Sequence, residues 1–184
     1  MLQTTKFPHH FQRSATLGER ASVVFEQLDD FERLGTHMMH SSPMMAGSSM
    51  RYEFDETRGR AQHGLVHLRG SVLGFELTID EEVIERTPPV AKTWQTVGTP
   101  RMLVLDAYRM GYVLEPQQGG SRLTVFIDYA LPSRGVARWL GRFAGAAYAR
   151  WCVTSMIEDA VRSFGSGDAQ TRGAQGDIHL TPLE

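Results

Sequence analysis

Apolar residues recur with two different periods along this chain, and the period changes twice. Between residues 20 and 38 they return every three or four positions, which predicts two short helices. Between residues 50 and 131 they alternate with polar residues, which predicts antiparallel strands that bury one face. From residue 136 to residue 164 the helical period returns, which predicts one long amphipathic helix packed on the sheet. A weaker alternation over residues 11–17 predicts a first strand.

The long C-terminal helix is predicted from a single apolar stripe. The members of this stripe are Val136, Leu140, Phe143, Ala147, Trp151, Ile157, Val161 and Phe164. Arg138 and Arg142 take the opposite side, and the arginines of this stretch exclude a membrane span. Gly141 and Gly145 lie four positions apart and allow a close backbone approach. Packing on the sheet and contact with a second copy both explain that spacing.

Turn residues divide the alternating region into strands. Gly70-Ser71, Thr87-Pro88-Pro89 and residues 116–119 are typical of tight turns. Turns at these places predict the pairs Val66–Phe75, Leu68–Leu73, Val83–Lys92, Glu81–Trp94, Tyr112–Leu123 and Asp106–Tyr129. All three registers bring apolar residues onto one face, whereas a slip of one residue would reverse every assignment.

That predicted inner face is mostly apolar and carries few polar groups. Its apolar members are Val66, Leu68, Leu73, Phe75, Leu77, Ile79, Val83, Trp94, Met110, Leu123, Val125 and Ile127. Its polar members are Tyr52, Glu81, Asp106, Tyr108, Tyr112 and Tyr129. An apolar surface with a few convergent polar groups is typical of a small-molecule site. We therefore expect a hydrophobic ligand to contact Tyr52, Phe75, Leu77, Trp94, Tyr108, Met110, Tyr112, Val125, Ile127 and Tyr129, with Met38 and Met45 at the entrance.

Glu81 and Asp106 are the candidate catalytic residues. A carboxylate in an apolar cavity has its charged form disfavoured, so its pKa rises toward the range of a general base or acid. Enolisation and aldol cyclisation need such a base beside a group that stabilises an oxyanion, which a tyrosine hydroxyl supplies. The alternative is structural: either carboxylate is solvated at a strand end, or paired with Lys92 or an arginine.

Composition narrows the class of protein. The chain has 184 residues, 41% hydrophobic and 22% charged, with a formal net charge of −2, which suits one globular domain and argues against a nucleic-acid binder. Cys152 is the only cysteine, so a disulfide framework and a multi-cysteine zinc site are excluded. We expect one domain over residues 1–165 and a mobile Gly-rich tail over residues 166–184. The N-terminus resembles no signal peptide, so the expected location is the cytoplasm.

A methionine cluster follows the second predicted helix. It comprises Met38, Met39, Met44, Met45 and Met50. With His37 and His40 these thioethers could hold a soft metal, but no thiolate accompanies them and thioethers alone specify a metal site weakly. Flexible packing at a cavity mouth is the favoured interpretation. We expect no metal and no cofactor, because no phosphate loop or dinucleotide motif is present.

Three sequence blocks carry a resemblance to a known family. They are ASVVFEQLDD at residues 21–30, EVIERTPP at residues 82–89, and YVLEP at residues 112–116 followed by GGSRLT at residues 119–124. In this order they make the sequence resemble the START/SRPBCC superfamily, most closely its bacterial polyketide cyclase/dehydrase and lipid-transport-like members. The resemblance implies the α+β helix-grip fold, in which a curved antiparallel sheet of about seven strands wraps round the C-terminal helix and encloses an apolar cavity.

The same resemblance leaves the function open between classes. Members of the superfamily bind lipids, sterols, quinones or polyketides, and a minority do chemistry, so the fold does not decide between binder and enzyme. Binding or carriage of a small hydrophobic molecule is the leading expectation. The alternatives are a cyclase, aromatase or dehydratase that uses Glu81 or Asp106 as base, and an interaction module with a vestigial cavity. A monomer and a homodimer are both compatible with the sequence.

Overall fold

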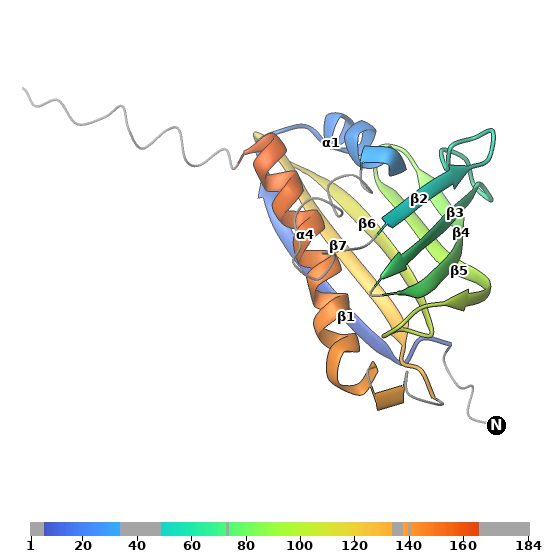
Figure 1. The fold of residues 1–184 in the computed structure, drawn as a ribbon. Helices are drawn as coiled ribbons and strands as arrows, with labels where there is room; N and C mark the ends of the chain where they lie inside the picture. The colour runs from blue at the N-terminus through green and yellow to red at the C-terminus, as the bar shows by residue number, and fades with distance from the viewer. Residues whose placement is uncertain (1–5, 34–48, 73, 134–137, 140, 166–184) are drawn as a thin grey trace, which may run out of the picture.

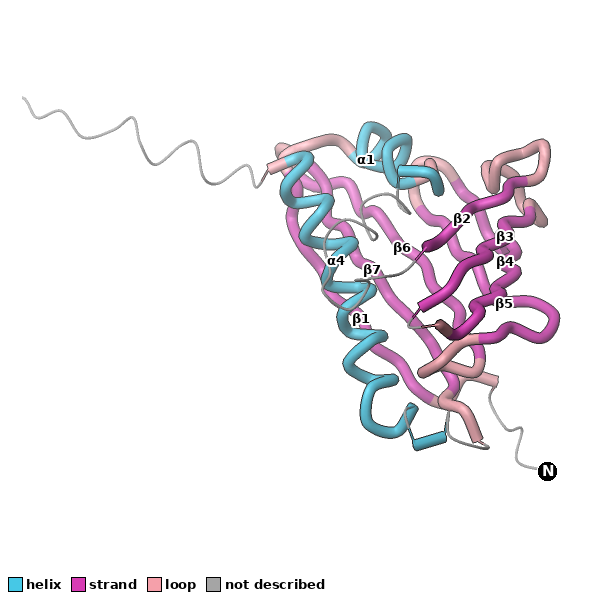
Figure 2. Tube along the Cα trace, viewed as in Figure 1, coloured by secondary structure: helices cyan, strands magenta, loops and turns pink. Residues whose placement is uncertain are grey.

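Seven strands form one antiparallel sheet in the order β1-β7-β6-β5-β4-β3-β2. The computed structural model describes residues 6–33, 49–72, 74–133, 138–139 and 141–165. The strands are β1 (His9–Leu17), β2 (Ser49–Phe54), β3 (Leu65–Val72), β4 (Phe75–Thr87), β5 (Ala91–Arg101), β6 (Ala107–Gln117) and β7 (Gly120–Ala130). The helical elements are α1 (Ala21–Leu28), the π-helical turn η2 (Gly141–Gly145) and α4 (Ala146–Phe164). Figures 1 and 2 show how the sheet curves from β1, beside α4, to its other edge at β2.

Both helices pack on the same face of the sheet. α4 lies lengthwise against β1 and β7, and α1 lies across one end against β6 and β7 (Figure 1). Their apolar side chains join those of the inner strand face in one core, as Phe25, Val125 and Val153 illustrate. This is the helix-grip architecture that the two hydrophobic periods predict, with β1 where the weaker alternation placed it. No helix among the described residues is long and apolar enough to cross a membrane.

The predicted hairpin registers are wrong by even numbers of residues. Leu68 pairs with Ile79 rather than with Leu73, and Tyr112 pairs with Val125 rather than with Leu123. The glycine with the positive φ that a tight turn needs is Gly74, at φ 82°, whereas Gly70 lies inside β3. Because side chains alternate with a period of two, an even shift changes the partner but keeps the face. Each residue within these strands therefore keeps the face that its position in the alternation gives it, although its partner changes.

The pairing of β4 with β5 contains a register shift that the sequence does not reveal. Val83 pairs with Trp94 rather than with Lys92, and the register changes between Val83 and Glu85. A bulge of this kind adds one residue to one strand and lets a new side chain turn inward. The extra residue lies on β4, so Arg86 comes to pair with Lys92. Lys92 and Trp94 share the inner side of β5 by alternation, and both are buried.

The predicted apolar stripe of the C-terminal helix is wrong in its first half. Phe143 is 75% exposed, and the positions that face the sheet are Gly141, Gly145 and Ala149. The error already begins within α4, because the predicted Ala147 is exposed and the sheet-facing side is taken by glycine and alanine rather than by the large apolar residues. A Cβ atom added at Gly145 would lie 2.4 Å from Leu131 and 2.9 Å from a backbone oxygen, so this glycine serves close packing on the sheet end.

Several predictions fall on parts of the chain outside the described residues. These are the methionine cluster with its expected role at the entrance, including Met38 and Met45, and the tail over residues 166–184. Of the second predicted helix, residues 31–33 are described and are helical.

Candidate functional site

Glu81 occupies the middle of the inner sheet face. It is 4% exposed and lies between the buried residues Ile79 and Val83 on β4. Its cross-strand neighbours are Val66 on β3 and Thr96 on β5, both buried. The alternation of β4 thus places one carboxylate in an otherwise apolar part of the core.

Tyr108 is the hydrogen-bond partner of Glu81. The Tyr108 hydroxyl donates to Oε1 of Glu81 from β6, two strands away. Thr96 on the intervening strand fixes the position of Tyr108, because the Thr96 hydroxyl oxygen accepts from the Tyr108 N–H at 3.2 Å and lies 3.3 Å from its carbonyl oxygen. The side chain of Thr96 thereby continues the β5–β6 pairing beyond Gln95 and Arg109. The pair is held by strands rather than by loops.

Burial dominates the electrostatics of this pair. It raises the pKa of Glu81 to about 7, although the Tyr108 hydrogen bond, the charge of Lys92 and the Trp94 indole all lower it. Burial and the charge of Glu81 raise the pKa of Tyr108 well above its ordinary value. Near neutral pH the carboxyl group can therefore both give and accept a proton, while the tyrosine stays a hydrogen-bond donor.

Three further polar groups surround the pair. Burial and the charge of Glu81 raise the pKa of Tyr52 on β2, and the neighbouring Cys152 and burial raise the pKa of Tyr148 on α4. Burial raises the pKa of Cys152, one turn after Tyr148, to about 12, so this thiol stays protonated at neutral pH. Tyr148 was not among the predicted ligand-contacting residues, although its i,i+4 spacing from Cys152 places both side chains on one helix face.

The predicted ligand-contacting residues fall into three groups in the structure. Trp94, Met110, Tyr112, Val125, Ile127 and Tyr129 are buried on the inner face. Tyr52, Leu77 and Tyr108 are partly exposed. Phe75 is on the inner side of β4 by alternation, but it is 59% exposed at the start of the strand. It is therefore not part of the buried inner face.

Asp106 does not join Glu81. It is exposed and lies one residue before β6, where its N–H donates to the carbonyl oxygen of Ala130. The expectation that it faces the cavity is wrong, because the alternation that placed it there ends at the start of the strand. The alternative, a solvated carboxylate at a strand end, describes it.

A second buried charged cluster links α1 to the sheet. Asp29, the C-cap residue of α1, receives hydrogen bonds from Lys92 at 2.8 Å and from two nitrogens of Arg86, the closer at 2.8 Å. Lys92 is fully buried, also donates to the backbone oxygen of Asp29 at 2.8 Å, and lies 4.1 Å from the centre of the Phe31 ring. A cation at this helix end is favoured by the helix dipole. Lys92 therefore pairs with Asp29, and neither predicted carboxylate is its hydrogen-bond partner.

The Asp29 carboxylate of this second cluster stays charged at neutral pH. Burial alone would raise the pKa of Asp29, but the hydrogen bonds and charges of Arg86 and Lys92 hold it below its ordinary value. Burial lowers the pKa of Lys92 to about 8, against the effect of Asp29. Tyr112 lies edge-on to Phe25 nearby, and its buried hydroxyl has no hydrogen-bond partner among the residues described.

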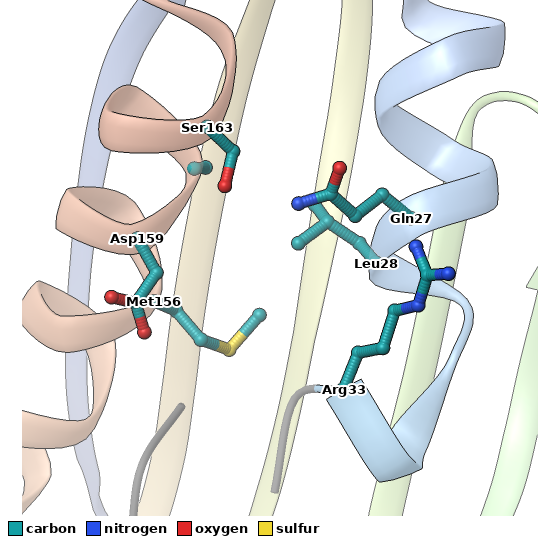
Figure 3. Close-up of a pocket in the computed structure, with 7 residues that line it drawn as sticks. Gln27, Leu28, Arg33, Met156, Asp159 and Ser163 are labelled. Atoms are coloured by element: carbon teal, nitrogen blue, oxygen red, sulfur yellow. The ribbon is translucent and has the colours of Figure 1, made fainter. Parts of the chain in front are cut away.

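A small hollow separates α1 from α4. It measures about 20 Å³ and is lined by Gln27, Leu28, Arg33, Met156, Asp159, Ala160 and Ser163. Figure 3 shows the side chains of α1 and the turn after it facing those of α4 across the gap. Ligand pockets usually measure roughly 300–1,000 Å³, so this hollow by itself does not accommodate an organic ligand.

The histidines of β3 and of the turn before it lie within hydrogen-bond distance of carboxylates on the outer surface. His63 lies 2.7 Å from Glu82, and His67 lies 2.7 Å from Asp80. In the described part of the chain, no three His, Cys, Asp or Glu side chains gather as they would around a metal ion. His37 and His40 lie outside the described residues.

No protein-family model and no curated protein matches this chain, but solved structures do. The protein TTHA0849 from Thermus thermophilus matches with a TM-score of 0.59 at 13% identity, over 84% of this chain and 98% of that one. The Zhui aromatase/cyclase from a Streptomyces species matches with a TM-score of 0.57 at 16% identity, over 86% and 98% of the two chains. Ara h 8.0201 matches with a TM-score of 0.54 at 11% identity, over 84% and 98%.

At these identities the similarity concerns the fold. Each match spans nearly the whole of the solved chain and more than four fifths of this one. The seven-stranded sheet, its antiparallel order and the lengthwise α4 account for that coverage. This chain therefore has the helix-grip fold that the resemblance to the START/SRPBCC superfamily implies.

Proposed function

We propose that this chain binds a small hydrophobic molecule between the inner face of the sheet and α4, with Glu81 and Tyr108 contacting its polar group. The hydrogen bond between the buried Glu81 carboxyl group and Tyr108 carries the proposal. A buried carboxylate costs folding free energy unless a cation pairs with it, and Glu81 hydrogen-bonds to a neutral hydroxyl instead. A costly group held in place by regular strands is typical of a functional site.

The surroundings of the pair support an apolar ligand with one hydrogen-bonding group. Trp94, Met110 and Ile127 supply apolar walls on the neighbouring strands. Because the pKa of Glu81 is about 7, its carboxyl group can donate to a ketone or accept from a phenol. Lipid-like, quinone-like and polyketide-like molecules all fit this description.

Probe binding tests the proposal. We expect the uncharged fluorophore N-phenyl-1-naphthylamine to gain fluorescence with the full chain. Leu77→Trp, which adds bulk on the partly buried inner side of β4, should weaken probe binding at least tenfold. Thr78→Trp adds the same bulk one residue later, on the opposite side of the strand, and should leave binding unchanged.

Two results would contradict ligand binding at this place. One is wild-type protein that leaves the probe fluorescence unchanged, and the other is equal affinity in the Leu77→Trp and Thr78→Trp variants. Native mass spectrometry and solvent extraction of the purified protein would then identify any molecule that co-purifies.

A second function is favoured by the acid–base character of Glu81. In a cyclase-type reaction the Glu81 carboxylate would remove a proton from the carbon between two ketones, leaving an enolate. Once Glu81 holds the proton it no longer needs the Tyr108 hydrogen bond, and the Tyr108 hydroxyl would turn to donate to the enolate oxygen. Attack of the enolate carbon on a second carbonyl would form a C–C bond, and the proton held by Glu81 would return to the new alkoxide. The Zhui aromatase/cyclase has the same fold.

Deuterium exchange separates this enzyme from a simple binder. We expect the wild-type chain to accelerate exchange of the acidic C–H protons of a β-diketone in D₂O, with a rate that rises around pH 7 as Glu81 ionises. Glu81→Gln should lower the acceleration at least 100-fold. Glu82→Gln removes the adjacent carboxylate, which pairs with His63 on the outer face, and should have no effect. Exchange at the background rate in wild type would exclude the enzyme and leave the binder intact.

A further inference from the structure

Two aromatic side chains project from the chain just before α4. Trp139 is 68% exposed and Phe143 is 75% exposed, and they are the two most exposed large hydrophobic residues among those described. Their rings stack with centroids 5.6 Å apart. Contiguous exposed apolar side chains mark surfaces that contact something else. Figure 1 shows that η2 lies at the end of the molecule opposite to α1.

The glycines of η2 fix the direction in which the aromatic pair points. Gly141 and Gly145 are buried, and a Cβ atom at Gly141 would lie 2.7 Å from Pro132 and 3.1 Å from the backbone oxygen of Val104. This close contact leaves no room for the helical segment to roll. The side opposite the glycines, with its aromatic pair, is therefore held toward solvent.

The residues that flank the pair in the sequence carry only positive charge. Arg138 and Arg142 are exposed beside Trp139 and Phe143, and neither has an ion-pair partner among the described residues. Between residues 133 and 157 the sequence contains four arginines and no acidic residue, although the whole chain has a net charge of −2. We call Arg138, Trp139, Arg142 and Phe143 the aromatic–arginine patch.

We propose that the aromatic–arginine patch docks this protein on an anionic lipid surface. Tryptophan and phenylalanine insert shallowly at the membrane interface, and arginines beside them attract anionic headgroups. A stable protein–protein interface buries roughly 800 Å² per partner, whereas two aromatic side chains offer about 150–250 Å² each. Reversible contact with a lipid surface needs only such a small, protruding, positively charged tip.

This inference is independent of the proposed ligand site. The patch lies outside the core, and its aromatic side chains do not contact Glu81 or Tyr108 in the interactions described. Variants of the patch should therefore retain N-phenyl-1-naphthylamine binding, so the two proposals can fail separately.

Vesicle flotation with the full chain tests the docking surface. At low salt we expect binding to phosphatidylcholine vesicles in which roughly a third of the lipid is phosphatidylserine. Pure phosphatidylcholine vesicles should bind little protein, and about 0.5 M NaCl should abolish binding to the anionic vesicles. Arg138→Gln/Arg142→Gln should lower the partition coefficient about 25-fold, since each arginine near an anionic surface contributes about fivefold. Trp139→Ser/Phe143→Ser should lower it tenfold or more.

Matched variants control for unspecific loss of charge and of apolar surface. Arg51→Gln/Arg122→Gln removes two exposed arginines from the sheet, and Leu65→Ser/Val90→Ser removes two exposed apolar side chains elsewhere. Both should bind like wild type. The proposal is overturned by absence of wild-type flotation with anionic vesicles, or by equal losses in control and patch variants. A third result would also overturn it. Mass photometry would show a dimer, or a complex with an acidic protein, and Trp139→Ser/Phe143→Ser would dissociate that assembly while vesicle binding persists.

Discussion

Two buried carboxylates in this core have opposite pKa shifts, although burial by itself would raise the pKa of both. Asp29 contacts the cations of Arg86 and Lys92, and its pKa is lowered. Glu81 contacts the neutral hydroxyl of Tyr108, and its pKa is raised to about 7. Asp29 therefore remains charged at every physiological pH, whereas Glu81 exchanges a proton near neutrality.

The difference follows from what each carboxylate connects. Asp29 caps α1 and is bound by side chains of β4 and β5, so its interactions hold a helix on the sheet. Glu81 and Tyr108 both belong to the sheet itself, and their hydrogen bond joins strands that are already held by Thr96. The first cluster has a structural role, and the second is available for a ligand.

Removal of the Asp29 carboxylate tests the structural role and should have the largest effect. Asp29→Ala leaves Lys92 buried without its counter-ion, which typically costs about 3–5 kcal/mol. Urea denaturation at pH 7 measures this loss. Asp30→Ala removes the adjacent carboxylate, which forms partly exposed ion pairs with Arg60 and Arg33, and should cost less than about 1 kcal/mol. Equal losses would show that the Asp29 cluster does not anchor α1.

Neutralising Glu81 should have the opposite sign and depend on pH. Because the folded-state pKa of about 7 exceeds the ordinary 4.5, the folded protein binds the proton more tightly and loses stability as pH rises from 4.5 to 7. The full loss is about 3 kcal/mol. Glu81→Gln should therefore be about 3 kcal/mol more stable than wild type at pH 8 and about equal at pH 4.5. Denaturation at both pH values measures the difference, and Glu82→Gln should show no such gain.

Replacing both charges of the first cluster should have a smaller effect than removing one. Asp29→Asn/Lys92→Met leaves no buried unpaired charge, and such exchanges are often nearly neutral. We expect the double variant to lie within about 1–2 kcal/mol of wild type by urea denaturation. A loss as large as that of Asp29→Ala would mean that α1 needs the ion pair itself rather than merely the absence of an uncompensated charge.

The sequence predicted which side of the sheet each strand residue faces, but it did not predict the cross-strand partners, and both outcomes have one physical reason. Alternation assigns Glu81 and Trp94 to the inner side whatever the register, because only an odd shift changes the face. The positions of the turns, the bulge after Val83 and the π-helical turn before α4 depend on three-dimensional packing. Phe143 was assigned to the buried stripe although it is exposed, because glycines and an alanine rather than the large apolar residues face the sheet there.

The same distinction explains which site residues could be identified. Glu81 lies inside a clear alternating strand, whereas Asp106 lies just outside one and was misplaced. The bond between Asp29 and Lys92 spans 63 residues of sequence, and no local pattern marks the two residues as partners. Lys92 still carried a signal, because a lysine two positions from Trp94 on a buried strand needs an acidic partner.

Removal of the Tyr108 hydroxyl is the smallest of these changes and sharpens the role of the second cluster. The hydroxyl donates to the Glu81 carboxylate and so lowers its pKa. In Tyr108→Phe the pKa of Glu81 should rise above 7, and stability at pH 8 should fall by about 1–2 kcal/mol, as expected for a hydrogen bond to a charged group. Carbon-13 NMR titration of the Glu81 carboxyl group measures the pKa directly. Tyr52→Phe, which removes a nearby hydroxyl without that hydrogen bond, should shift the titration less. If the Glu81 carboxyl group titrates at the same pH in both variants, burial alone sets its pKa. Tyr108 could then bind a ligand without changing the pKa of Glu81.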